Sequence, residues 1–375
     1  MKVALTGGRG FLGWHTAVRL HALHTMDPVL LGRKSFENAS SLATDLIGID
    51  TVIHLAGINR ADSEDAVEDG NIEIAATLAD AISISAQPMH LVYGNSIQSQ
   101  LDNPYGRGKL RASEILEAAV RNAGGTFADA QLPNIFGEHG RPNYNSFVAT
   151  FCNEIVRGGR PAVIQDKLVS LLHAQRAASV LIDAAMSREP VRLQPTGEAH
   201  LVSDVLSMLR DFHDKYRRGQ IPALDNAFAV DLFNTYRSYM FPQSFPFKST
   251  VNEDPRGQLF EAVRVHGGTG QTFVSTTAPG MTRGDHFHLS KIERFFVVQG
   301  LAEIALRKVH DDEVIRFRVS GKERAFVDMP TMWVHNIRNV GEDDLITLFW
   351  ADQLLNPAAP DTYWEPVDPD EKALL

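Results

Sequence analysis

Two groups of residues in this sequence have side chains and spacings suited to chemistry. In the first, NPYGRGK places Tyr105 and Lys109 four residues apart at the start of a helical pattern, and therefore on one helix face. A lysine ammonium beside a phenol favours the phenolate, which suits a tyrosine that exchanges a proton with a carbonyl or an alcohol. Ser96 ends a strand-like run and can hydrogen-bond the same oxygen. Because Tyr-x-x-x-Lys pairs are common by chance, the surrounding elements must support this interpretation.

The second group lies near the other end of the chain. GDHFHLSKIERFFVVQG contains His286, His288 and Glu293, and MPTMWVHN adds His335. Residues two apart on a strand point to the same face, so the first two imidazoles can meet one ion. Three imidazoles and one carboxylate suit zinc, iron, manganese, nickel or copper. A lone His-x-His is more often surface chemistry, but this full set among short strands favours a metal site.

A glycine-rich loop precedes the first group. In LTGGRGFLG, Gly7 allows a tight turn, Gly10 lets the backbone approach a pyrophosphate, and Gly13 allows close packing of helix and strand. The phosphate then lies at a helix N-terminus, where free N–H groups favour it. Arg33 follows the second strand, where an NAD enzyme usually carries an acid, and it can pair with a 2′-phosphate. This favours NADPH over NADH, the alternative being that Arg33 is a solvated loop cation.

The elements around these residues predict two different architectures. Apolar runs at 2–6, 29–32, 51–57 and 89–94 alternate with helical patterns at 12–24, 71–86 and 105–123, which is typical of an α/β, Rossmann-type doubly wound parallel sheet. From about residue 251, short apolar runs follow one another closely between turns, which is typical of an all-β jelly roll. Residues 203–250 are first helical and then aromatic and proline-rich. We place the boundary near 247, giving domains 1–247 and 248–375.

Composition limits the class of protein. The 375 residues suffice for two or three domains, and 44% hydrophobic with 22% charged residues is typical of a globular chain. A net charge of −10 argues against a general nucleic-acid binder. The single cysteine, Cys152, cannot form an internal disulfide and lies in an apolar stretch typical of a buried residue. With no apolar run of the roughly 18 residues that span a membrane, and no signal-peptide pattern, we expect a cytoplasmic protein.

The first 245 residues resemble the extended short-chain dehydrogenase/reductase family. The features that match are TGGRGFLG, HLAG (54–57), Ser96, the Tyr105/Lys109 pair and PNIFG (133–137). The resemblance implies that Tyr105 is the catalytic acid and base, that Lys109 lowers its pKa and holds the nicotinamide ribose, and that Ser96 orients the substrate carbonyl. It also implies further residues that line the cofactor or the substrate: Arg9, Phe11, Leu12, Leu55, Ala56 and Gly57 for the cofactor, and Asn134 for the substrate.

Residues 248–370 resemble the cupin family, in which His286, His288, Glu293 and His335 would bind the metal. DPRGQLFE (254–261) and TRGDH (282–286) also resemble the deoxysugar-nucleotide 3,5-epimerase branch of cupins, where the histidine of this motif is a base. His286 is therefore either a metal ligand or the catalytic base, and both alternatives stay open. Arg256 and Arg283 become candidates for gripping a diphosphate or polarising a sugar oxygen, the alternative being that they are surface cations.

Together, in this order, the two domains resemble the bifunctional reductases of capsular polysaccharide synthesis, on the route to UDP-N-acetyl-L-fucosamine. Local runs such as HLAGINR (54–60), DNPYG (102–106) and PNYNS (142–146) carry the match. The resemblance implies a UDP-linked 4-keto-6-deoxy-hexosamine substrate, epimerised at C-3 and then reduced at C-4 to UDP-2-acetamido-2,6-dideoxy-L-talose. It also implies zinc as the metal and a homodimer. Two alternatives remain: a ketoreductase whose cupin domain is only structural or dimerising, and a non-catalytic NADPH-binding sensor.

Overall fold

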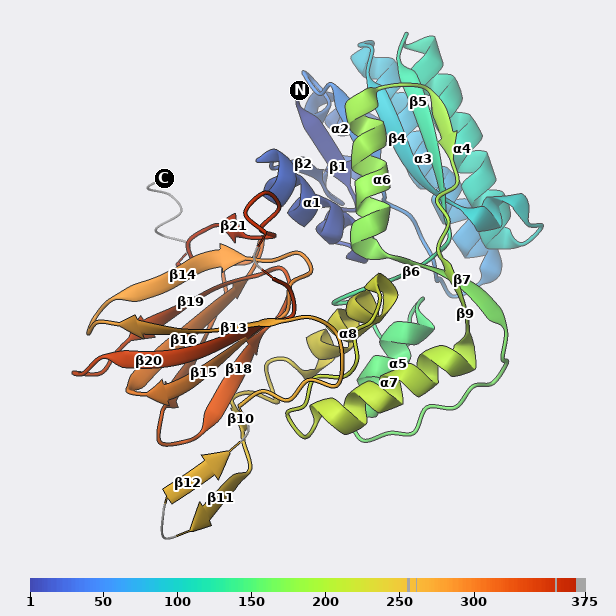
Figure 1. Ribbon diagram of the computed structural model, residues 1–375. Coiled ribbons are helices and arrows are strands. Elements are labelled where there is room, and N and C mark those ends of the chain that lie inside the picture. Colours follow the sequence, from blue (N-terminus) through green and yellow to red (C-terminus); the bar gives the residue numbers. More distant parts are fainter. Residues whose placement is uncertain (255–256, 261, 355, 369–375) are drawn as a thin grey trace. The chain divides into compact units, whose positions relative to one another are not determined.

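The chain forms two compact units (Figure 1). The computed structural model describes residues 1–254, 257–260, 262–354 and 356–368. One unit comprises Met1–Thr150 with Gln165–Val202, and the other Phe151–Ile164 with Ser203–Leu375. In space, residues 203–247 therefore group with the β-rich part of the chain. The domain boundary near residue 247 stays a prediction.

The first unit is built on a parallel sheet of six strands, in the order β2-β1-β3-β4-β5-β8. The chain leaves β1 for β2 on one side and returns to β3 on the other, so the sheet is doubly wound, as predicted. The carboxyl ends of β1 and β3 then flank the point where the strand order reverses. The strands are β1 (Val3–Thr6), β2 (Val29–Leu31), β3 (Thr51–His54), β4 (His90–Ser96), β5 (Thr126–Leu132) and β8 (Val191–Leu193).

Helices cover both faces of this sheet (Figure 1). Alternate strand residues point to opposite faces, so Val52 packs on one side and Ile53 on the other. The Val52 side is covered by α2 (Ala39–Asp45), α3 (Glu64–Ser85) and α4 (Pro104–Asn122), and the Ile53 side by α1 (Phe11–His24) and α6 (Ala174–Ser187). Short 3-10 helices occupy Ser35–Glu37 and Ile97–Gln100. A small second sheet joins β6 (Asn134–Phe136), β7 (Leu168–His173) and β9 (Glu198–Leu201).

The second unit contains an antiparallel sandwich of two five-stranded sheets, ordered β10-β18-β15-β20-β13 and β17-β16-β19-β14-β21. Buried residues from both sheets, such as Phe295 and Ile337, form the core between them, which agrees with the predicted jelly roll. The strands are β10 (Phe247–Lys248), β13 (Gln271–Thr277), β14 (Thr282–Phe287), β15 (Glu293–Gln299), β16 (Leu301–Lys308), β17 (Val314–Ser320), β18 (Ala325–Met329), β19 (Trp333–Asn339), β20 (Leu345–Ala351) and β21 (Tyr363–Trp364). A separate hairpin pairs β11 (Val251–Asp254) with β12 (Gly257–Phe260).

Two helices of the second unit, α7 (Val202–Tyr216) and α8 (Ala227–Met240), precede this sandwich, and α5 (Phe147–Val156) runs into the unit from the first one. The end of α7 is tied to the sandwich, because the Tyr216 hydroxyl donates to Asp328 Oδ2 over 2.5 Å. The same carboxylate accepts from Arg294 Nε and Nη2 at 2.7 and 2.9 Å, and both charged side chains are buried. Cys152 is fully buried, as expected. Among the described residues, no helix combines the length and the hydropathy that crossing a membrane requires.

Candidate active sites

The glycine-rich loop joins β1 to α1 and has the backbone geometry that its glycines predict. Gly7 has a φ of +67°, and a Cβ there would lie 2.8 Å from Ala56 N. A Cβ on Gly13 would lie 2.1 Å from Gly7 O, so only glycine allows α1 to approach the turn this closely. No side chain caps the N-terminus of α1 at Gly10, so its first N–H groups are free for an anion. The loop fits the pyrophosphate of a dinucleotide.

Residues 55–57 lie beside this loop because Thr6 holds them there. Its Oγ1 accepts hydrogen bonds from the N–H groups of Leu55 and Ala56, both over 3.0 Å. The single hydroxyl proton is then donated to His54 Nδ1 at 2.7 Å. Burial, followed by the charge of Lys109, lowers the pKa of His54 to about 3, so this histidine is neutral. Thr6 and His54 support the predicted cofactor loop, and the sequence reasoning missed them.

The predicted proton-transfer residues meet at the carboxyl end of β4. Asn103 caps α4 by accepting from Gly106 N over 2.8 Å, which sets the first turn that carries Tyr105. A hydrogen bond joins the side chains of Tyr105 and Ser96. Lys109, one turn later, donates from Nζ to Gly94 O over 2.8 Å and lies 4.2 Å from the centre of the Tyr93 ring. The structure thus brings the three residues to one place.

The electrostatics of this group differ from the expectation. Burial raises the pKa of Tyr105 above its usual 10, and the hydrogen bond from Ser96 opposes that rise. Burial lowers the pKa of Lys109 to about 7, and only the carboxylate of Asp129 on β5 pulls it upward. The lowering of the phenol pKa predicted from Lys109 is therefore not found, because burial raises this pKa and the group that opposes the rise is Ser96. Asp129 is itself buried, with its Oδ1 atom unpaired, and nothing in its sequence context marked it.

The other predicted binding residues are more scattered. Arg33 is exposed just after β2. Because β2 runs parallel to β1, Arg33 lies at the same end of the strands as the glycine-rich loop. Asn134 begins β6, and its amide donates to Ser170 O over 3.4 Å. Arg283 on β14 donates to the Thr277 hydroxyl and to a backbone carbonyl of β13. Arg256 lies outside the described residues.

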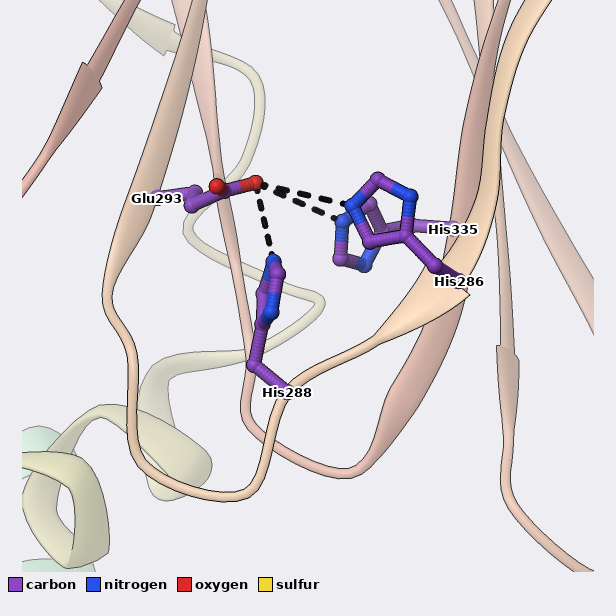
Figure 2. A group of neighbouring side chains, drawn as sticks. All are labelled: His286, His288, Glu293 and His335. Carbon is purple, nitrogen blue, oxygen red and sulfur yellow. Dashed lines mark ion pairs between the residues drawn. The ribbon is translucent and has the colours of Figure 1, made fainter. Parts of the chain in front are cut away.

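The second predicted site is assembled within the sandwich (Figure 2). His286 on β14 is directly opposite His335 on β19, so both imidazoles point to the same face. His288 follows two residues later, and Glu293 begins β15 in the facing sheet. Glu293 Oε2 lies 3.0 Å from His288 Nε2, 3.6 Å from His335 Nε2 and 4.0 Å from His286 Nε2. All four predicted ligands therefore converge on one point.

This arrangement fits a divalent transition metal. The four ligand atoms lie within 4.8 Å of one another, and tetrahedral bonds of zinc to nitrogen would place such atoms about 3.3 Å apart. His288 Nε2 and His335 Nε2 are buried and have no hydrogen-bond partner, which suits ligand atoms. Burial lowers the pKa of His335 to about 4, so its ring is neutral. Burial raises the pKa of Glu293, but the electrostatic influence of the surrounding histidines, His288 foremost, holds it well below its usual range.

Neighbouring groups orient these ligands. His288 Nδ1 donates to Asp361 O over 2.5 Å, and His335 Nδ1 donates to Trp333 O over 2.9 Å, which leaves each Nε2 as the donor atom for a metal. The Asp361 carboxylate accepts from the backbone N–H groups of residues 289–291, next to His288. Gly284 has a φ of +113°, and a Cβ there would lie 2.7 Å from His335 O. The sequence reasoning missed the role of Asp361.

Comparison with known proteins agrees with this two-part structure. Residues 3–185 match the NAD dependent epimerase/dehydratase family, and residues 252–363 match the polysaccharide biosynthesis C-terminal domain. A UDP-2-acetamido-2,6-β-L-arabino-hexul-4-ose reductase from Pseudomonas aeruginosa is 31% identical over 369 residues, which are 97% of this chain and 98% of that protein.

Solved structures are similar as well. The capsular polysaccharide assembling protein CapF from Staphylococcus aureus is 31% identical, with 98% of this chain and 100% of that chain covered and a TM-score of 0.58. A UDP-N-acetylglucosamine 4-epimerase from Methanobrevibacter ruminantium M1 is 16% identical over 64% of this chain and 98% of its own, with a TM-score of 0.53, and this likeness concerns the fold alone.

Proposed function

Because the chain belongs to the family of two-domain capsular polysaccharide nucleotide-sugar reductases, in which an extended short-chain dehydrogenase/reductase domain precedes a cupin domain, we propose that it is a bifunctional epimerase and reductase. Membership makes it a nucleotide-sugar enzyme that works with a nicotinamide cofactor. Our proposal is that the cupin domain epimerises C-3 of a UDP-4-keto-6-deoxy-hexosamine. The N-terminal domain then reduces the C-4 ketone with NADPH, giving UDP-2-acetamido-2,6-dideoxy-L-talose.

The observation that carries the reductase half is the grouping of Ser96, Tyr105 and Lys109 beside the glycine-rich loop. The reduced nicotinamide, when bound, supplies the hydride for C-4. Ser96 holds the carbonyl oxygen by a hydrogen bond, and Tyr105 donates its phenolic proton to that oxygen as the alcohol forms. Lys109, held by Gly94 O, places a cation near the resulting phenolate until solvent returns the proton. A non-catalytic sensor needs none of these acid and base groups.

For the epimerase half, the adjacent ketone makes the C-3 hydrogen acidic, and a metal held by the cupin site would polarise such an oxygen as a Lewis acid. We assign His286 to the metal ligands and not to the role of base, because its Nε2 atom converges with the other two imidazoles on Glu293. Zinc suits this set of ligands. Epimerisation precedes reduction in this scheme, since reduction removes the ketone on which epimerisation depends.

The test is to incubate the enzyme with NADPH and the UDP-4-keto sugar in D2O. We expect deuterium at C-3 of the product, detected by mass spectrometry and NMR, together with oxidation of NADPH. Tyr105→Phe should keep the C-3 exchange and lose NADPH oxidation, whereas His288→Ala should lose exchange but still reduce a substrate epimerised beforehand. If the full-length wild-type protein incorporates no deuterium while it reduces the ketone, the cupin domain is structural and the epimerase half is wrong.

The preference for NADPH rests on Arg33, which is exposed at the end of the second strand, near the glycine-rich loop. Arg33→Ala should raise the KM for NADPH about tenfold or more and leave that for NADH nearly unchanged, because only NADPH carries the 2′-phosphate. An equal effect on both cofactors would contradict this assignment. The homodimer and the cytoplasmic location stay predictions, for which sedimentation and fractionation are the direct measurements.

A further inference from the structure

Two exposed arginines of the first unit lie near one tyrosine ring beside the proton-transfer group. The guanidinium carbons of Arg60 and Arg141 lie 5.9 and 5.0 Å from the centre of the Tyr144 ring. Tyr144 is close enough to Tyr105 to raise the pKa of that phenol electrostatically. Arg60 and Arg141, here called the arginine pair, are therefore near the place where the sugar ketone is proposed to react.

The loops that carry the arginine pair are held by specific hydrogen bonds. Arg60 Nη1 donates to Asn143 O over 3.1 Å, which joins the loop after β3 to the loop after β6. The buried Asn71 on α3 fixes the first loop by accepting from Ile58 N at 3.1 Å and donating to Ile58 O at 2.7 Å. In the second loop, Asn143 has a φ of +53° and donates from its N–H to the Thr150 hydroxyl over 3.0 Å. These hydrogen bonds thus hold the backbone of both loops and the side chain of Arg60.

The arginine pair has no balancing carboxylate. Among the residues that the structure describes, no acidic side chain lies within ion-pair distance of either guanidinium, although the chain has a net charge of −10. By contrast, Arg107 on the neighbouring α4 is paired with Glu68 at 2.8 Å and with Asp102 at 2.9 Å. Two unneutralised guanidinium groups near one ring repel each other, and a bound anion would relieve that repulsion.

We propose that the arginine pair binds the diphosphate of the nucleotide-linked sugar, an inference that rests on the proposed function. The ketone at C-4 is placed at Tyr105, and the diphosphate is attached at C-1, on the opposite side of the hexose ring. The diphosphate must then lie about one sugar ring away from Tyr105. Tyr144, which is close enough to act electrostatically on Tyr105, and the arginine pair near its ring are candidates for that place. Planar guanidinium groups match phosphate oxygens through paired hydrogen bonds. The pyrophosphate of the dinucleotide has its own place at the glycine-rich loop.

The test measures binding of UDP and of NADPH to the full-length protein by calorimetry. For UDP we expect Kd to rise about tenfold in Arg60→Ala and in Arg141→Ala, and about a hundredfold in the double variant, because each loses charge-assisted hydrogen bonds. NADPH affinity should be unchanged in all three. Arg111→Ala is the matched control, since Arg111 is an exposed arginine already paired with Glu114 at 2.9 Å, and it should leave both affinities unchanged. With the keto sugar, KM should rise while kcat changes little.

A folded double variant that binds UDP as tightly as wild type would overturn the inference, as would weaker NADPH binding with UDP binding intact. Arg60→Lys and Arg141→Lys keep the charge, so a loss smaller than that of the alanine variants would support direct phosphate contact over damage to the loops. If wild type reduces the keto sugar but the double variant keeps its KM, the arginine site is wrong and the proposed function stands. If UDP binding depends on the pair but NADPH is never oxidised, the function is wrong and the site stands.

Discussion

Replacing Lys109 with methionine should change how the stability of the protein depends on pH. Lys109 is only 6% exposed. Burial lowers its pKa from an ordinary value of 10.5 to about 7 in the folded chain. Between these two pH values the unfolded chain binds one more proton than the folded chain, so folding becomes more favourable as pH rises. The penalty for folding with a protonated Lys109 is fully present below pH 7 and disappears toward pH 10.5. Lys109→Met has no such penalty at any pH.

The size of the effect follows from the two pKa values. Each pKa unit is worth about 1.4 kcal/mol, so the free energy of unfolding of wild type should rise relative to Lys109→Met by about 2 kcal/mol between pH 7 and pH 9. Below pH 6 the difference should be constant. Urea unfolding followed by circular dichroism at pH 5, 6, 7, 8 and 9 measures it, and Lys34→Met, which removes an exposed lysine, is the control. If the difference between wild type and Lys109→Met stays constant from pH 7 to 9, Lys109 is not destabilised by burial and the reasoning is wrong.

Four further changes test the same structure. Asp129→Asn removes the carboxylate that raises the pKa of Lys109, so the pH-dependent rise in stability should begin at a lower pH, and an unshifted curve would contradict this. Gly13→Ala would place a Cβ 2.1 Å from Gly7 O, and it should weaken NADPH binding about tenfold or more in a fluorescence titration. Arg294→Met removes the cation that neutralises the buried Asp328, so it should cost about 3–5 kcal/mol of unfolding free energy, and a loss under 1 kcal/mol would show that this pair is dispensable. His288→Ala should abolish stoichiometric zinc, measured by plasma mass spectrometry, and with it the thermal stabilisation that added zinc gives wild type.

Local patterns predicted the elements that carry the chemistry. The strands expected at 2–6 and 29–32 agree with β1 and β2 to within one residue, because short buried runs between turn signals leave few other choices. The helix expected at 71–86 begins earlier, at Glu64, because Ser63 caps it by accepting from Ala66 N and its first turns are polar. Periodicity of apolar residues cannot detect a helical turn that is exposed. The helix α8 was not predicted either, although its buried residues Phe228, Leu232 and Tyr236 recur at helical spacing and Asn226 caps it by accepting from Ala229 N.

Contacts between distant parts of the chain could not be predicted in the same way. His286 and His335 were expected to share a metal ion, but the strand register that places them directly opposite each other could not be read from the sequence. The pKa of Tyr105 depends on burial, which no spacing in NPYGRGK encodes, so its direction could not be predicted. Arg60 and Arg141 are far apart in sequence and have no common motif. Their relationship depends on the hydrogen bond from Arg60 to Asn143 O.

The two proposed half-reactions depend on each other in different ways. The residues assigned to each half-reaction lie within a single unit. Ser96, Tyr105 and Lys109 belong to the first unit, and the metal-ligand cluster belongs to the second. Epimerisation of a ketone is reversible and makes and breaks the same kind of C–H bond, so it has little driving force. Reduction by a nicotinamide removes the ketone, and with it the acidity at C-3, which traps the epimer as an alcohol. A chain that joins the two therefore gains direction from its reductase and stereochemistry from its cupin, and neither site alone would commit the sugar to one product.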